Sequence, residues 1–217
     1  MPKTEPFDTL TDRYDGWFVR HESVYLAELR AVRALLPEGG RILEVGIGTG
    51  RFAVPLGVTE GVDPSAPARA MARERGISVH AGVAEALPFP DGVFDAVLMI
   101  TTLCFVDDVY LALREARRTL RPGGVLVLSI VDRDGPMGAD YVAKARSNPF
   151  YKDAAFFGAA ELLELLLAAG FCDLRAAQTL FAPPDAVSPE EPVLDGHGAG
   201  GFAVLRGTKP ISPDPRA

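Results

Sequence analysis

The chain has 217 residues, a length typical of one domain built around a single core. Its 22 Lys and Arg residues against 29 Asp and Glu give a net charge of -7, so it lacks the positive field that a nucleic-acid backbone or an anionic lipid surface requires. A hydrophobic share of 48% with 24% charged residues is typical of a soluble globular protein and excludes a disordered chain. We therefore expect neither a nucleic-acid nor a membrane partner.

The N-terminal sequence and the two cysteines indicate a cytoplasmic location. Residues 1–6 are followed by charged sequence and contain no apolar segment, so we expect no signal peptide. No run of about 18 apolar residues occurs that would span a bilayer. Cys104 and Cys172 lie inside apolar stretches, which favours two free, buried thiols over a disulfide or a metal ligand.

Residues 1–39 are expected to form an N-terminal helical cap. Apolar residues recur at intervals of three and four from Tyr25 to Leu36, which predicts one long amphipathic helix that ends at Pro37. A shorter helical piece is expected before it. The aromatic and basic residues between positions 14 and 21 belong to this piece.

From residue 40 to residue 209 the pattern changes to alternating strands and helices, with expected strands at 41–45, 58–62, 77–80, 94–100 and 125–131. One intervening helix is capped by Ser65 and closed at Gly76. Another begins at Asp107 or Asp108 and is stopped by residues 122–124. This alternation predicts a mostly parallel sheet covered by helices on both faces, with a binding site at the carboxyl ends of its strands.

Residues 132–158 break this alternation because they are mixed, charged and aromatic, and we expect them to form a lid-like insertion over the strand ends. A Leu-rich helix follows at 161–169, and two further strands are expected near 173–179 and 202–206. The tail at 210–217 is expected to be flexible.

The strand at 41–45 runs into glycines at positions 46, 48 and 50. Glycine there lets the backbone turn sharply and approach a ligand closely, while the next helix presents unpaired N–H groups. A dinucleotide fingerprint requires a small residue where Arg51 stands, which disfavours a nicotinamide cofactor.

The segment from Glu44 to Gly50, an acidic residue followed by G-x-G-x-G, resembles the first motif of class I S-adenosylmethionine-dependent methyltransferases with a type 11-like domain. The resemblance continues through Asp63, residues 82–95 and residues 120–126, in the family's order and spacing. It implies a Rossmann-like α/β fold: a seven-stranded, mostly parallel sheet of order 3-2-1-4-5-7-6, with the last strand antiparallel and helices on both sides. It also implies S-adenosyl-L-methionine as the cofactor and S-adenosyl-L-homocysteine as the product.

The resemblance further implies a cofactor site, in which Asp63 accepts hydrogen bonds from both ribose hydroxyls. Val83 departs from the family, which commonly has an Asp there for the adenine amino group, so adenine recognition would fall to the backbone near Ala84 and to Glu85. Two alternatives stay open: Glu44 caps backbone N–H groups, and Asp63 caps the helix after Pro64. The expected cofactor-binding residues are Glu44, Gly46, Ile47, Gly48, Thr49, Gly50, Asp63, Pro64, Ala84, Glu85 and Thr101.

No catalytic residue is assigned, because methyl transfer from a sulfonium is an in-line displacement that depends mainly on orientation. An acceptor of high pKa would need a base, for which His21, Tyr14 and Asp132 are the candidates. No metal is expected, since three scattered histidines and two distant cysteines have no metal-ligand spacing. The candidates for the acceptor site and lid are Tyr14, Trp17, His21, Thr102, Leu103, Tyr141 and Tyr151. Two of them have an open alternative: Leu103 packs in the core, and Trp17 fixes its helix to the core.

The sequence thus predicts an S-adenosylmethionine-dependent methyltransferase for a small-molecule acceptor. A non-catalytic protein that binds the cofactor or its demethylated product is one alternative, and an NAD(P)-dependent oxidoreductase is a weaker one. The acceptor, the methylated atom and the oligomeric state are left open.

Overall fold

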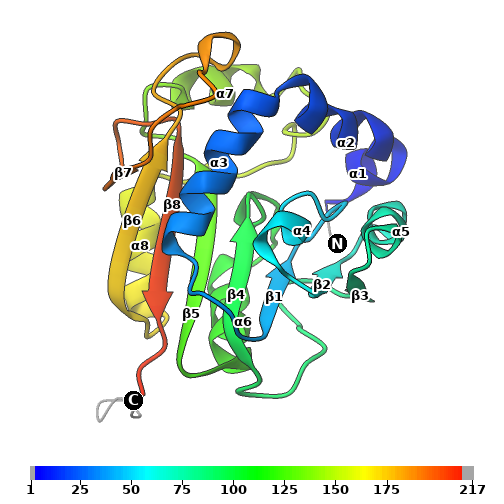
Figure 1. The fold of residues 1–217 in the computed structure, drawn as a ribbon, viewed down its shortest axis with the longest axis vertical. Helices are drawn as coiled ribbons and strands as arrows, with labels where there is room; N and C mark the ends of the chain where they lie inside the picture. Colours follow the sequence, from blue (N-terminus) through cyan, green and yellow to red (C-terminus); the bar gives the residue numbers. More distant parts are fainter. Residues whose placement is uncertain (1–2, 212–217) are drawn as a thin grey trace.

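The computed structural model describes residues 3–211, which form an eight-stranded sheet in the order β3-β2-β1-β4-β5-β8-β6-β7 (Figure 1). Strands β1 to β5 run parallel, β8 is antiparallel to β5, and β6 is antiparallel to β8. The strands are β1 Ile42–Val45, β2 Glu60–Asp63, β3 Ser78–Ala81, β4 Phe94–Ile100, β5 Leu120–Val131, β6 Cys172–Thr179, β7 Leu194–Asp195 and β8 Phe202–Thr208.

The expected Rossmann-like fold is confirmed, with β8 as the expected seventh strand and the order 3-2-1-4-5-7-6 preserved. The count of seven strands was wrong by one. The additional strand, β7, has two residues and pairs with Ala177 and Gln178 at the edge of the sheet. Two residues are too few to show the alternation of apolar and polar positions by which a strand is recognised in a sequence.

Helices cover both faces of the sheet because successive strand residues point to opposite sides. On β4, Ala96 and Leu98 pack in the core cluster that includes α3, whereas Val97 and Met99 pack in the cluster that includes α6 and α8. The helices are α1 Glu5–Thr9, α2 Thr11–Arg20, α3 Glu22–Leu35, α4 Ala53–Leu56, α5 Ala66–Glu74, α6 Val109–Thr119, α7 Gly138–Ala145 and α8 Ala159–Ala168, with 3-10 turns at Leu103–Phe105 and Pro184–Ala186.

Two predicted helix caps are confirmed. The Ser65 hydroxyl accepts a hydrogen bond from the Ala68 N–H (3.4 Å), and the Asp108 carboxylate accepts one from the Leu111 N–H (2.9 Å). The predicted stop of α6 at residues 122–124 was wrong, since α6 ends at Thr119 and β5 begins at once. The pairing of β4 with β5 shifts between Phe94 and Ala96, so the Pro-Gly-Gly sequence forms an irregularity within the strand rather than a helix stop.

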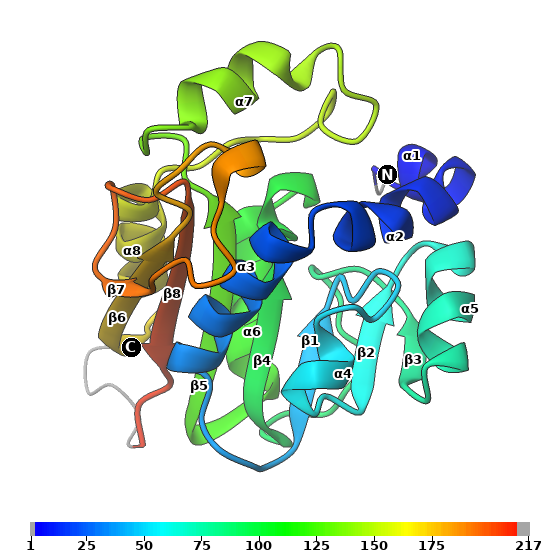
Figure 2. The same ribbon diagram turned by 45° about the horizontal axis from the view of Figure 1, so that its top comes forward.

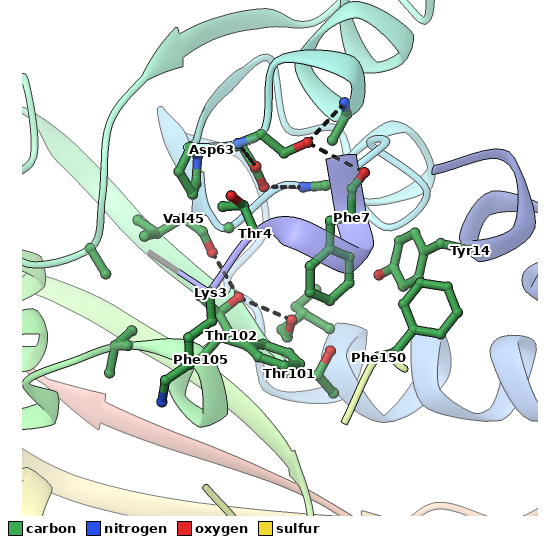
Figure 3. Close-up of a pocket in the computed structure, with 18 of the residues that line it drawn as sticks. Lys3, Thr4, Phe7, Tyr14, Val45, Asp63, Thr101, Thr102, Phe105 and Phe150 are labelled. Atoms are coloured by element: carbon green, nitrogen blue, oxygen red, sulfur yellow. Dashed lines mark hydrogen bonds between the residues drawn. The ribbon is translucent and has the colours of Figure 1, made fainter. Parts of the chain in front are cut away.

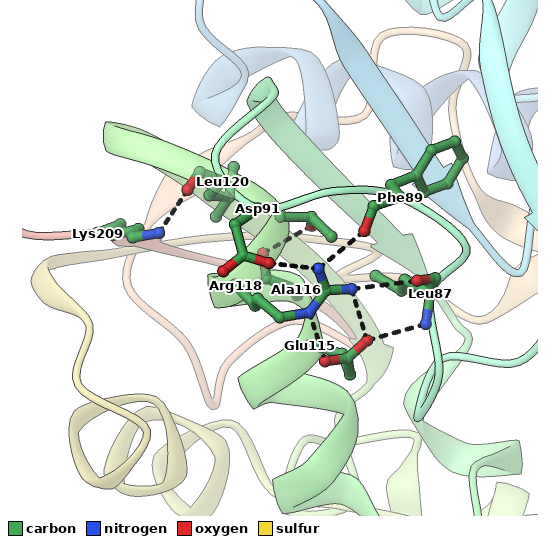
Figure 4. A network of polar contacts seen from close by, with 9 residues as sticks. Leu87, Phe89, Asp91, Glu115, Ala116, Arg118, Leu120 and Lys209 are labelled. Carbon is green, nitrogen blue, oxygen red and sulfur yellow. Dashed lines mark hydrogen bonds and ion pairs between the residues drawn. The ribbon is translucent and has the colours of Figure 1, made fainter.

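The loop between β3 and β4 is fixed to α6 by the guanidinium of Arg118 (Figure 4). Arg118 donates to the carbonyls of Leu87 (3.1 Å) and Phe89 (2.8 Å) and pairs with Glu115 and Asp91 (2.7 Å each). Glu115 in turn accepts from the Leu87 N–H at 2.9 Å. These contacts hold residues 87–91 of the loop against α6.

The two cysteines are unpaired, as expected, but both are half-buried rather than fully buried. The thiol of Cys104 donates to the Thr101 carbonyl at 3.1 Å. Within residues 3–211, no helix is long and apolar enough to cross a membrane. Most of the tail expected to be flexible, residues 212–217, lies outside the described residues.

Candidate functional site

A cavity of about 720 Å³ lies at the carboxyl ends of β1, β2 and β4, a volume within the range of about 300–1,000 Å³ that is typical of small-molecule sites. Residues 3–21 and residues 141–151 contribute to its lining from the N-terminal helices and from the segment around α7. Figure 2 shows α1, α2 and α7 above the same end of the sheet. A ligand at the strand ends would therefore be covered by two segments far apart in sequence.

The glycine turn after β1 forms one wall of the cavity. Gly46 and Gly48 both have positive φ, +70° and +53°, a conformation that favours glycine. A Cβ on Gly46 would lie 2.5 Å from the Thr102 side chain, so only glycine fits there. A Cβ on Gly48 would come no closer than 3.6 Å to Tyr14, which shows that the absent side chain leaves space on the cavity side.

The Asp63 carboxylate ties the ends of β1 and β2 together (Figure 3). Its Oδ2 accepts from the Gly48 N–H and its Oδ1 from the Ser65 N–H, each at 2.8 Å. Burial raises the pKa of Asp63, and the two backbone hydrogen bonds oppose this rise. Each oxygen retains a lone pair, so the carboxylate is still able to accept from a ligand. Ser65 caps α5, so the alternative that Asp63 caps this helix was wrong.

Glu44 lies behind the glycine turn and is 2% exposed. Its Oε2 has no hydrogen-bond partner among residues 3–211. No backbone N–H in that part of the chain is bonded to this carboxyl, so the capping alternative finds no support. Burial, and then the charge of Asp63, raise the pKa of Glu44 well above its usual range.

Asp15 on α2 fastens the N-terminal helices to the glycine turn, and sequence reasoning missed it. Its carboxylate accepts from the Thr49 hydroxyl (2.6 Å), Arg51 Nε (2.9 Å) and Arg75 Nη2 (2.9 Å). Burial opposes ionisation of Asp15, but hydrogen bonds from Arg51 and Arg75 hold its pKa well below the usual range. An Asp on an amphipathic helix resembles an ordinary surface acid, so no sequence signal marked it.

Comparisons with known proteins find chains of similar sequence. A family model described as a methyltransferase domain matches residues 43–128. An uncharacterised protein of Methanocaldococcus jannaschii is 40% identical over 203 residues, 94% of this chain and 98% of that protein. The ubiquinone biosynthesis O-methyltransferase of Azorhizobium caulinodans is 32% identical over 172 residues, 72% of this chain and 67% of that protein.

A crystal structure from Thermotoga maritima shows the same fold with closer sequence similarity. That protein is described as an S-adenosylmethionine-dependent methyltransferase and a possible histamine N-methyltransferase. It has 49% identity and a TM-score of 0.91, covering 94% of this chain and 97% of that one. This chain belongs to the S-adenosylmethionine-dependent methyltransferase family.

The cofactor residues expected from the sequence separate into two groups in this methyltransferase. Thr49 and Ile47 are buried behind the turn, as are Glu44 and Gly50, and none of the four lines the cavity. The Glu85 carboxylate accepts from the N–H groups of Asp107 (2.7 Å) and Asp108 (3.3 Å), so it also holds the next loop. The expected residues that line the cavity are Gly46, Gly48, Asp63, Pro64, Ala84, Glu85 and Thr101.

The expected acceptor and lid residues also lie at the cavity of the methyltransferase, with one exception. Leu103 is 1% exposed and packs in the core with α6 and α8, so its assignment to the site was wrong. The Thr102 hydroxyl donates to the Val45 carbonyl at 3.0 Å and fixes the end of β4 beside the turn. The expected residues that line the cavity are Tyr14, Trp17, His21, Thr102, Tyr141 and Tyr151.

The three candidate bases differ in their surroundings. Asp132 is outside the cavity lining, and its Oδ1 accepts from the N–H groups of Asp134 and Ala159 (3.1 Å each), so it supports the start of α8. Burial, with the charges of Asp63, Glu44 and Glu28, raises the pKa of Tyr14 far above its usual range, so its hydroxyl is a donor at neutral pH. The His21 ring stacks on Trp17 with centroids 4.8 Å apart.

An aromatic cluster lines the cavity where residues of α1 and α2 meet Phe150 (Figure 3). Phe7 lies 5.1 Å from Phe105, 5.4 Å from Tyr14 and 5.7 Å from Phe150, measured between ring centroids. Sequence reasoning missed Phe7 and Phe150, because α1 has only five residues and Phe150 lies in an irregular segment. Their roles depend on contacts across more than a hundred residues of chain.

Proposed function

We propose that this methyltransferase binds S-adenosyl-L-methionine in the cavity and transfers its methyl group to a small-molecule acceptor by in-line displacement. The observation that carries the proposal is the Asp63 carboxylate, bonded to Gly48 at the open side of the glycine turn and facing a covered cavity. The covering of this end of the sheet by residues 3–21 and 141–151 suits a small acceptor.

The residues at the turn fit this cofactor. The free lone pairs of Asp63 would accept from the ribose hydroxyls. Glu44, a buried carboxyl whose Oε2 has no hydrogen-bond partner among residues 3–211, lies behind the turn and would support the bound cofactor through the turn rather than by lining the cavity. Val83 lines the cavity where the family commonly has an Asp, so we expect adenine to meet the backbone of Ala84 rather than a carboxylate. When bound, the cofactor supplies a methyl group activated by a sulfonium.

The protein's own part in the reaction is to orient the acceptor and exclude water. Alignment of two reactants supplies on the order of 7–11 kcal/mol of barrier lowering. Phe7, Phe150 and Phe105 line the cavity, and the Tyr14 hydroxyl, which keeps its proton, lies near Gly48, where it would be able to donate to a ligand. We infer that residues 1–39 act as a cap and residues 132–158 as a lid, in a cytoplasmic enzyme that needs no metal.

Transfer of a labelled methyl group tests this function. Purified protein is incubated with methyl-labelled cofactor and a heat-treated whole-cell extract, with Asp63→Ala as the matched inactive variant. After removal of the unreacted cofactor, label is expected in a low-mass product only with the wild-type protein. Label in protein or nucleic acid would contradict the proposed acceptor class. Tight cofactor binding with no transfer would instead favour a non-catalytic binding protein.

A further inference from the structure

Glu28 is a buried carboxylic acid that lines the cavity from the side opposite Asp63. It belongs to α3, which packs on β5, β6 and β8, whereas Asp63 ends β2 on the other half of the sheet. The residue is 9% exposed, and no hydrogen bond or ion pair reaches its carboxyl within residues 3–211. Burial alone raises the pKa of Glu28 to about 8, because no positive charge offsets it.

Tyrosines share this part of the cavity wall with Glu28. Tyr14 on α2, Tyr141 on α7 and Tyr151 beyond α7 line the same cavity, and Tyr25 lies about one turn before Glu28 on α3. Burial, and to a smaller extent the charges of nearby acids that include Glu28, raises the pKa of all four phenols. The hydroxyl of Tyr25 is engaged with the Arg51 carbonyl at 2.6 Å. The wall around Glu28 is therefore aromatic, with phenols that stay neutral at neutral pH.

The Arg and Lys side chains that line the cavity contact residues other than Glu28. The Arg13 guanidinium lies over the Phe150 ring, 5.9 Å from its centroid, and Arg20 donates to the Arg13 carbonyl at 3.1 Å. Lys3 lies beside Thr102 and Phe105 in Figure 3. Within residues 3–211, Glu28 thus lies beside aromatic side chains and forms no ion pair with a cationic side chain.

An unpaired buried carboxyl is costly to a folded protein, and such groups normally have a partner in the working state. A cationic nitrogen suits both the Glu28 carboxyl and the aromatic rings of this wall, since it pairs with a carboxylate and is attracted to aromatic rings. We propose that Glu28 determines acceptor specificity, and that the acceptor carries a cationic nitrogen that pairs with the Glu28 carboxylate. This inference rests on the proposed function and leaves the methylated atom open.

Matched probes test the proposal by isothermal titration in the presence of saturating S-adenosylhomocysteine. Phenethylamine and phenethyl alcohol share a shape and differ in charge. The wild-type protein should bind the amine at least about tenfold more tightly than the alcohol. Glu28→Gln should bind the two equally, while Glu22→Gln, the same change on an exposed residue of the same helix outside the cavity lining, should keep the preference.

Equal binding of both probes by the wild-type protein, no binding of the amine at millimolar concentration, or a preference that survives in Glu28→Gln would each overturn the proposal. Failure of S-adenosylhomocysteine itself to bind would contradict the proposed function instead. The two failures are therefore distinguishable in one experiment.

Proton release on binding of the amine gives a second test. With a pKa of about 8, the free carboxyl is mostly protonated at neutral pH, so pairing with an ammonium should release close to one proton. Titration in buffers of different ionisation enthalpy measures this number. The phenols around Glu28 keep their protons, and His21 is the imidazole lining the same cavity. Binding of the amine to His21→Asn should therefore release the same number of protons as binding to the wild-type protein. Binding of the amine to the wild-type protein without proton release would overturn the proposal.

Discussion

At the scale of single residues, Asp63 joins the two strand ends that form the glycine-turn side of the cavity. Asp63→Ala removes the proposed acceptor for two hydroxyls and leaves the N–H groups of Gly48 and Ser65 without their partner. We expect the affinity for S-adenosylhomocysteine to fall by about 3 kcal/mol, or about 100-fold in Kd. Glu60→Gln is the control, since Glu60 on the same strand pairs with Arg41 outside the cavity lining. An unchanged Kd for Asp63→Ala would exclude Asp63 from the cofactor site.

Gly48 is predicted to be needed for space as well as for backbone conformation. Gly48→Ala and Gly57→Ala both place a side chain at positive φ, +53° and +73°, at a cost of about 1 kcal/mol in stability. Only the Cβ at Gly48 would enter the cavity, since Gly48 lines the cavity and Gly57 does not. Calorimetry should show at least about tenfold weaker cofactor binding for Gly48→Ala alone. Equal losses in both variants would show that strain, not space, is responsible.

The glycine turn and Asp63 could be predicted from the sequence because their spacing follows from local backbone geometry. Asp15 and Glu28 could not, because their roles depend on tertiary contacts. Asp15 meets Arg51 and Arg75 only after α2 folds over the turn. Glu28 is an ordinary helical Glu in the sequence, and only the fold places it in the wall of the cavity.

At the scale of elements, the attachment of α2 to the glycine turn is predicted to depend on Asp15. Asp15→Asn removes the ion pairs with Arg51 and Arg75 and should lower the free energy of unfolding by about 2 kcal/mol at neutral pH. Since the pKa of Asp15 is depressed in the folded state, this contribution is present above the ordinary carboxyl pKa of 3.8 and is lost as the pH falls below it.

Urea unfolding at neutral and acidic pH measures this effect. Asp12→Asn is the control, because Asp12 is an exposed acid on the same helix. A wild-type stability equal to that of Asp15→Asn at neutral pH would mean that the ion pairs contribute nothing.

The central strands and their helices could be predicted because buried strands are apolar runs and helix caps have short-range signatures. The prediction was wrong for the elements that lack such signals. The start of β5 follows α6 without a loop and contains a proline, and β7 exists only through its pairing with β6.

At the scale of the whole molecule, the raised pKa of Glu28 predicts an unusual pH dependence of the stability of the folded state. Its pKa rises from 4.5 to about 8 on folding, so above pH 4.5 the unfolded chain ionises and the folded chain does not. The folded state therefore loses stability relative to Glu28→Gln between these values, on the order of 2–3 kcal/mol near neutral pH. Thermal unfolding of both proteins from acidic to alkaline pH measures the difference. Parallel stability curves would contradict the buried, unpaired state of Glu28.

The wall of the cavity is also a property of the whole molecule, because it is built from segments that lie far apart in the sequence. Phe7 and Phe150 meet across the cavity although 142 positions separate them in the sequence. The motifs between residues 40 and 131 predict where the cofactor lies, but the acceptor side is built from the N-terminal helices and the insertion, whose packing no local pattern specifies.

Parallel isothermal titrations with S-adenosylmethionine, S-adenosylhomocysteine and NADH test the central claim most directly. We expect the two sulfur ligands to bind at one site per chain and NADH not to bind, because Arg51, paired with Asp15, stands where a dinucleotide site needs a small residue. Binding of NADH alone, or of none of the three, would contradict the assignment of the glycine turn and Asp63 to this cofactor.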